Sequence, residues 1–163
     1  MRTAACVTLC VVLLSWSTSS GGDKDKGKEP AFDAAKLVGQ WKYVSGEKGG
    51  AKVDEKSLKQ AVTITKETWT LKGKDDKGAD VTFVMKYELD TKKNPAGIKF
   101  TMTESPFGAG AKAQGIIELK GDDLRVCYNA DDGKDAPKEF KTKDGDKMHL
   151  FVLKRTKAEK PKN

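Results

Sequence analysis

Residues 81–90 read VTFVMKYELD, and their apolar and polar side chains alternate with one interruption, at Val84. A period of two is typical of a β-strand with one buried and one solvated face, because successive side chains point to opposite sides. Such strands pair antiparallel with their neighbours. We therefore expect Lys86 and Glu88, like Lys99 and Thr101 further on, to point outward. The side chains expected to point inward are Val81, Phe83, Met85, Tyr87 and Leu89.

The same alternation continues along the chain, and clusters of Gly, Asp, Asn and Lys separate the alternating segments. One short helix is predicted at 54–60, with Asp54 as its N-cap. Many short strands without interleaved helices indicate an all-β fold, a small antiparallel β-barrel of about eight strands with one short helix. The further predicted strands are 62–65, 68–72, 98–103, 115–120, 124–129, 138–143 and 148–155.

The first twenty residues are typical of an export signal. Arg2 provides a positive start, residues 4–14 are an uninterrupted run of uncharged and mostly apolar residues, and small polar residues follow. The alternative, a membrane anchor, needs a longer apolar run. Removing this signal also removes Cys6 and Cys10, so the mature chain keeps one thiol and no disulfide. We expect an exported protein, periplasmic or secreted, with no transmembrane segment after cleavage.

The rest of the chain divides by composition. The predicted organisation is a signal peptide at 1–20, a flexible linker at 21–35, a barrel domain at 36–155 and a basic disordered tail at 156–163. The chain has 163 residues, of which 37% are hydrophobic, so one modest core is expected.

Both ends of the predicted barrel domain resemble a known family. Residues 37–42, LVGQWK, are similar to the Gly-x-Trp opening of lipocalin-type barrels, and 150–155, LFVLKR, to their last strand. Residues 62–65, 121–128 and 137–140 resemble the lipocalin-like domain family of unknown function that is expanded in planctomycete bacteria. The resemblance implies that Gly39 turns the chain into the first strand, that Trp41 closes the barrel base, and that Arg155 lies over it. It implies no activity or ligand.

The charge pattern bears on partners. Lys and Arg number 31 against 24 Asp and Glu, a net charge of +7. Much of the excess is in the C-terminal tail, and the mature chain has only the arginines Arg125 and Arg155. Nucleic-acid recognition favours concentrated basic surfaces rich in Arg, so no nucleic-acid partner is expected. The tail could still adhere to anionic envelope polymers.

No motif in the sequence indicates catalysis or a cofactor. His149 is the only histidine and Cys127 the only mature thiol, whereas zinc needs three or four ligands. The glycines at 108–113 precede a predicted strand rather than a helix, so a dinucleotide site is not expected. Residues 129–135 fail the calcium-loop register and are interpreted as a hairpin turn. We expect no catalytic residues, no metal and no cofactor.

The inward-facing side chains are the remaining candidates. A barrel of about eight strands either is filled by its side chains or holds one small ligand, and periodicity does not separate the two. Trp41 and Arg155 are candidate structural residues. The candidate cavity-lining residues are Phe83, Met85, Tyr87, Phe100, Met102 and Tyr128.

Three functions follow as hypotheses. The first is a non-catalytic exported barrel, a monomer that binds a small apolar ligand or a protein partner. The alternative is a structural or adhesion module that binds a component of the cell envelope. An enzyme is the third, and it would need a contact between Cys127, His149 and a carboxylate.

The signal interpretation predicts that the mature protein begins between Ser19 and Asp23. Small residues at this point provide the cleavage site. N-terminal sequencing of exported material checks the prediction, and a mature chain that retains Met1 would contradict it.

Overall fold

The structure is a computed structural model and describes residues 32–75 and 77–156. The predicted signal peptide, most of the predicted linker and the tail beyond Thr156 lie outside these residues. None of the helices described is both long and apolar enough to cross a membrane. The strands are β1 (Gly39–Lys48), β2 (Ala51–Lys52), β3 (Ala61–Ile64), β4 (Thr68–Lys74), β5 (Asp80–Asp90), β6 (Ala96–Glu104), β7 (Lys112–Lys120), β8 (Asp123–Asn129) and β9 (Met148–Arg155).

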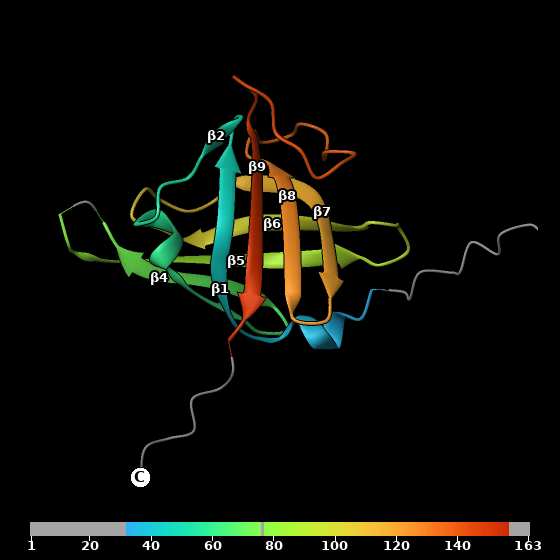
Figure 1. Cartoon of the computed structure of the whole chain (residues 1–163), viewed down its shortest axis with the longest axis horizontal. Helices are drawn as coiled ribbons and strands as arrows, with labels where there is room; N and C mark the ends of the chain where they lie inside the picture. The colour runs from blue at the N-terminus through green and yellow to red at the C-terminus, as the bar shows by residue number, and fades with distance from the viewer. Residues whose placement is uncertain (1–31, 76, 157–163) are drawn as a thin grey trace, which may run out of the picture.

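The strands form a closed antiparallel barrel. From β3 to β9 each strand pairs with the next along the chain, and β1 pairs with both β3 and β9, which completes a ring of eight. The short β2 pairs with the end of β1, outside the ring. In Figure 1, β1, β9, β8 and β7 run side by side, and β4, β5 and β6 cross behind them. The prediction of an all-β barrel of about eight strands is confirmed.

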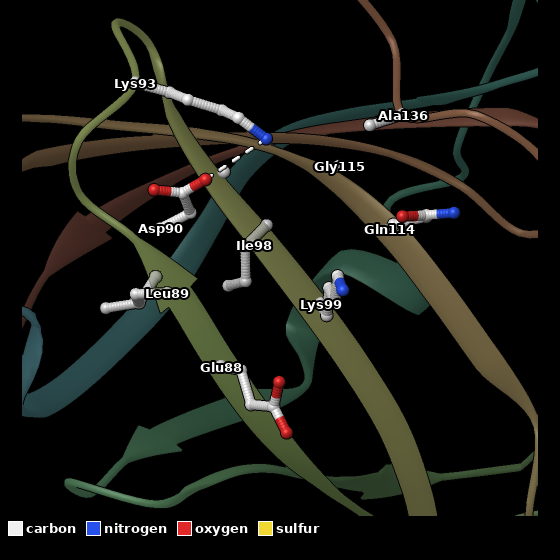
Figure 2. A pocket seen from close by; sticks show the side chains of 10 residues that line it. Glu88, Leu89, Asp90, Lys93, Ile98, Lys99, Gln114, Gly115 and Ala136 are labelled. Atoms are coloured by element: carbon white, nitrogen blue, oxygen red, sulfur yellow. Dashed lines mark ion pairs between the residues drawn. The ribbon is translucent and has the colours of Figure 1, made fainter.

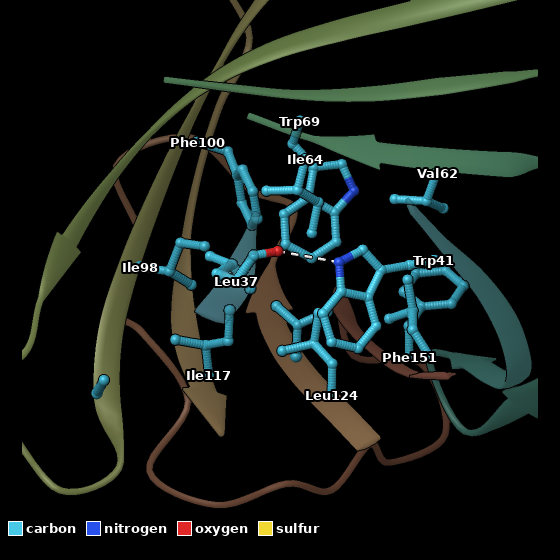
Figure 3. Packing of buried hydrophobic residues seen from close by; sticks show 13 residues of the cluster. Leu37, Trp41, Val62, Ile64, Trp69, Ile98, Phe100, Ile117, Leu124 and Phe151 are labelled. Atoms are coloured by element: carbon cyan, nitrogen blue, oxygen red, sulfur yellow. Dashed lines mark hydrogen bonds between the residues drawn. The ribbon is translucent and has the colours of Figure 1, made fainter. Parts of the chain in front are cut away.

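The two ends of the barrel differ in packing. At one end, here called the closed end, the β7–β8 turn lies beside a 3₁₀ turn, η1 (Ala34–Leu37) (Figure 1). Inward side chains there are almost completely buried and pack around Leu37 and Trp41 (Figure 3). At the opposite end, here called the loop end, inward side chains such as Phe83 and Met102 are half-buried. The core therefore sits toward the closed end.

Trp41 and Arg155 hold the closed end together. They are paired across β1 and β9, and the guanidinium carbon lies 4.2 Å from the Trp41 ring centroid. The indole Nε1 donates to the Leu37 carbonyl at 3.0 Å, and Arg155 donates to the carbonyls of Val38 and Lys36. Gly39 has a φ of 147°, and a Cβ there would meet Arg155 at 2.6 Å. Glycine is thus required where the chain enters β1.

The connection between β8 and β9 differs from its prediction. A strand was expected at 138–143 and a hairpin turn at 129–135, but residues 130–147 form an irregular segment, here called the strap. The strap packs on the outer face, where Pro137 is buried and the Arg125 guanidinium lies 4.5 Å from the Phe140 ring centroid. β8 already pairs with β7 and β9, so the ring leaves no strand edge for these residues. Both predictions were wrong.

Two further expectations need correction. The predicted helix at 54–60 is a single 3₁₀ turn, η2 (Ser57–Lys59), and Asp54 accepts from the Ser57 amide at 2.9 Å. The barrel domain begins earlier than 36, because Phe32 packs against the core and Asp33 caps η1. Residues 32–35 therefore belong to the folded domain and not to the linker.

Replacing Arg155 by Ala is expected to cost about 2 kcal/mol of unfolding free energy. The variant loses the stacking on Trp41 and leaves two carbonyl oxygens without their donor. Urea denaturation measures the change. The exposed neighbour Lys154 is the control, and Lys154→Ala is expected to change stability by less than about 0.5 kcal/mol. Equal effects of the two substitutions on the unfolding free energy would show that Arg155 does not stabilise the closed end.

Candidate functional site

Four rings gather on the inner face of β1, β8 and β9. Tyr43 lies 5.0 Å from Phe151, and Tyr128 lies 5.1 Å from His149, between ring centroids. The register places Tyr128 opposite His149. In β1 the register shifts between Tyr43 and Ser45, so Tyr43 shares the inner face with Lys48, which is opposite His149. We call Tyr43, Tyr128, His149 and Phe151 the inner ring cluster.

The polar groups of this cluster are uncharged at neutral pH. Burial, and secondarily the charge of Lys48, lowers the pKa of His149 to about 4. Its Nδ1 lies 3.2 Å from the Tyr128 hydroxyl, so the neutral ring can accept a hydrogen bond from it. Burial raises the pKa of Tyr43 and of Tyr128 above the usual value. Both phenols therefore stay protonated and can act as donors.

The Tyr43 hydroxyl has no hydrogen-bond partner among the described residues. The one polar side-chain atom in this part of the chain that is both fully buried and unpaired is Thr156 Oγ1. Tyr43 as a whole is half-buried. An unpaired hydroxyl beside apolar rings is a group that a bound molecule can satisfy.

The sequence-predicted lining residues all lie on the inner face, but in different surroundings. Phe100 is core: its ring meets Trp69 at 5.4 Å and Tyr128 at 5.6 Å, edge to face. Tyr87 donates its hydroxyl to the Thr65 carbonyl at 2.6 Å, toward the closed end. Phe100 therefore contacts the inner ring cluster through Tyr128, whereas the Tyr87 hydroxyl points away from the cluster.

The other three lining residues are half-buried toward the loop end. Met85 is opposite Met102 and packs against the core. Phe83 lies 6.3 Å from Phe107, whose ring is 90% exposed in the β6–β7 loop. These side chains leave apolar surface accessible at the loop end.

Sequence reasoning missed Tyr43, which shares the face of Trp41 by simple alternation, and Phe107. The alternation in β1 breaks at Val44, which is 54% exposed, so simple period-two counting misplaces the residues after it. Phe107 follows Ser105 and Pro106 in a turn, and an aromatic residue in such a turn was the available signal.

Cys127 and His149 do not form a nucleophile pair. Cys127 is opposite Leu150 on the outer face, whereas His149 points inward. The thiol donates to the Lys141 carbonyl of the strap at 3.7 Å, and burial raises its pKa to about 11. A thiol this weakly acidic is a poor nucleophile at neutral pH. In the part of the chain that the structure describes, no three His, Cys, Asp or Glu side chains are grouped to hold a metal ion.

A second candidate surface lies outside the barrel, on β5, β6 and β7. Two adjoining hollows of about 220 and 420 Å³ share Glu88, Lys99 and Gln114. Figure 2 shows the smaller one, where Lys93 and Asp90 form an ion pair of 3.1 Å and Ala136 of the strap stands over β7. We call the two hollows together the outer groove.

Comparison with known proteins gives no further assignment. No family model, no curated protein and no solved structure matches the chain. The resemblance to the planctomycete lipocalin-like family stays a prediction from the motifs.

The pKa of His149 predicts a specific pH dependence of stability. The unfolded chain binds a proton near the ordinary value of 6.5, but the folded protein binds it only near 4. The contribution of His149 to the free energy of unfolding is therefore complete above pH 6.5 and is lost as the pH falls toward 4. Chemical denaturation at pH 7 and pH 5 should show a larger loss of stability for the parent than for His149→Gln. The same loss of stability in the parent and in His149→Gln would contradict the lowered pKa of His149.

Proposed function

We propose that the chain is an exported, non-catalytic binding protein whose barrel takes a small amphipathic molecule. The observation that carries the proposal is the Tyr43 hydroxyl, which has no hydrogen-bond partner among the described residues and belongs to a ring packed beside Phe151. Export is supported by the signal-like first twenty residues alone.

The polar part of the ligand would bind at the inner ring cluster. Because burial keeps Tyr43 protonated, its hydroxyl can donate to a carbonyl, hydroxyl or carboxylate oxygen. The Tyr128 hydroxyl and the neutral His149 ring already pair with each other, so they offer less free capacity. A single hydrogen-bond acceptor on the ligand is enough to satisfy Tyr43.

The apolar part would lie toward the loop end. Met85, Met102 and Phe83 are half-buried there, and their soft or aromatic side chains are typical of ligand pockets. Inside the barrel the base at the closed end is filled, because Trp41 and Leu37 are 1% and 0% exposed. The exposed Phe107 ring beside Phe83 provides further apolar contact at the rim.

Native mass spectrometry of the full chain purified from its own host tests the proposal. We expect an added mass that denaturing conditions release. Tyr43→Phe should reduce the fraction carrying that mass at least threefold. Its unfolding free energy should change by less than about 0.5 kcal/mol, because the hydroxyl makes no hydrogen bond in the free protein.

Tyr87→Phe is the matched control. It also removes one hydroxyl, but one that is bonded to the Thr65 carbonyl away from the cluster. It should cost about 1 kcal/mol of stability and leave the bound fraction unchanged. Absence of any added mass, or equal reduction by both substitutions, would reject the proposed site.

A further inference from the structure

Three lysines converge in the outer groove around Thr101. Lys86 and Lys112 flank Thr101 directly, one on each neighbouring strand, and Lys99 lies two residues before it on the same face. Neighbouring strands are about 4.8 Å apart, so the Lys86 and Lys112 backbones are separated by about 10 Å. Lys99 is diagonal to both, a relation of about 7–8 Å. The groove thus holds three cations within a short span.

The charge of these lysines is only partly offset by the protein. None of the three forms an ion pair in the described part of the chain, while lysines close by, such as Lys93 and Lys74, pair with Asp90 and Asp80. Like charges in close proximity on a sheet are unfavourable without a counter-charge. Glu88 and Asp132 supply part of that counter-charge, and an anionic ligand supplies the rest.

The groove also contains fixed hydrogen-bonding groups. The strap forms one wall, and Gln114 holds it by donating Nε2 to the Lys134 carbonyl at 2.8 Å. Asn129 donates to the Asp135 carbonyl at 3.3 Å and fixes the strap further. Glu88, opposite Lys99, and Asp132 of the strap place carboxylates beside the lysines. The groove therefore offers both cations and hydrogen-bond acceptors.

We propose that the outer groove binds a linear polysaccharide that carries carboxylate groups. The ammonium groups of Lys86, Lys99 and Lys112 bind the carboxylates of the polymer. Its hydroxyl groups donate to Glu88 and Asp132, which a chain with only acidic groups could not do. A phosphodiester backbone presents acceptors and negative charge, so the same two carboxylates would repel it. This surface is separate from the inner ring cluster and independent of any ligand there.

The experiment is a titration of the full mature chain with polygalacturonate at about 150 mM salt, where exposed charges are screened beyond about 8 Å. Single-stranded DNA of similar length and neutral dextran are the comparison polymers. The test variant is Lys86→Gln/Lys99→Gln/Lys112→Gln. The matched control, Lys52→Gln/Lys56→Gln/Lys77→Gln, removes the same charge from exposed lysines elsewhere and leaves the basic tail intact.

We expect the groove variant to bind polygalacturonate at least tenfold more weakly and the control to stay within twofold of the parent. Glu88→Gln adds a second criterion, because it raises the net charge and replaces one of the two acceptor oxygens by an NH2 donor. It should weaken polygalacturonate binding and strengthen DNA binding. Equal losses in both triple variants, DNA bound as tightly as polygalacturonate, binding of neutral dextran with equal affinity, or no binding of polygalacturonate would each overturn the proposal.

Discussion

The guanidinium of Arg155 lies over the indole ring of Trp41, and this contact joins the first and last strands of the barrel. Its N–H groups extend the link to the carbonyls of Val38 and Lys36, so η1 is tied to the same point. The indole in turn donates to Leu37. One arginine and one tryptophan thereby connect three segments that are far apart in the chain. The absence of a side chain at Gly39 leaves the space that the guanidinium occupies.

The dense packing of the closed end leaves the loop end as the part of the barrel interior where a ligand could bind. Leu37 and Trp41 fill the base, whereas Phe83, Met85 and Met102 toward the loop end are half-buried. The neutral His149 and the protonated tyrosines make the inner ring cluster suited to hydrogen bonding rather than to acid–base chemistry. The proposed ligand site is a consequence of this gradient in packing.

The period of two was enough to predict the barrel. In β5 and β6 one face is buried, and a slip of one residue would bury Lys86 and Glu88, so the pattern specifies the orientation of each side chain. It failed for residues 138–143, because alternation in sequence does not supply a partner strand and the closed ring has no free edge. The strap instead covers Cys127 on the outer face.

The sequence predicted the candidate sites less completely than it predicted the fold. Lys48 faces inward, on the same side as Tyr43, because the register of β1 shifts after Tyr43, and a shift of this kind changes which later residues share a face. The outer groove depends on register between β5, β6 and β7, which places Lys86 and Lys112 on either side of Thr101. Neither arrangement follows from spacing within a single strand.

A double-mutant cycle between Trp41 and Arg155 measures the closing contact most directly. Unfolding free energies of the parent, Trp41→Leu, Arg155→Ala and the double variant separate the stacking from the hydrogen bonds that Arg155 makes elsewhere. The structure predicts a coupling energy of about 1 kcal/mol, the range of a partly desolvated cation–π contact. Strictly additive effects of the two substitutions would contradict the account, since the first and last strands would then be joined without this contact.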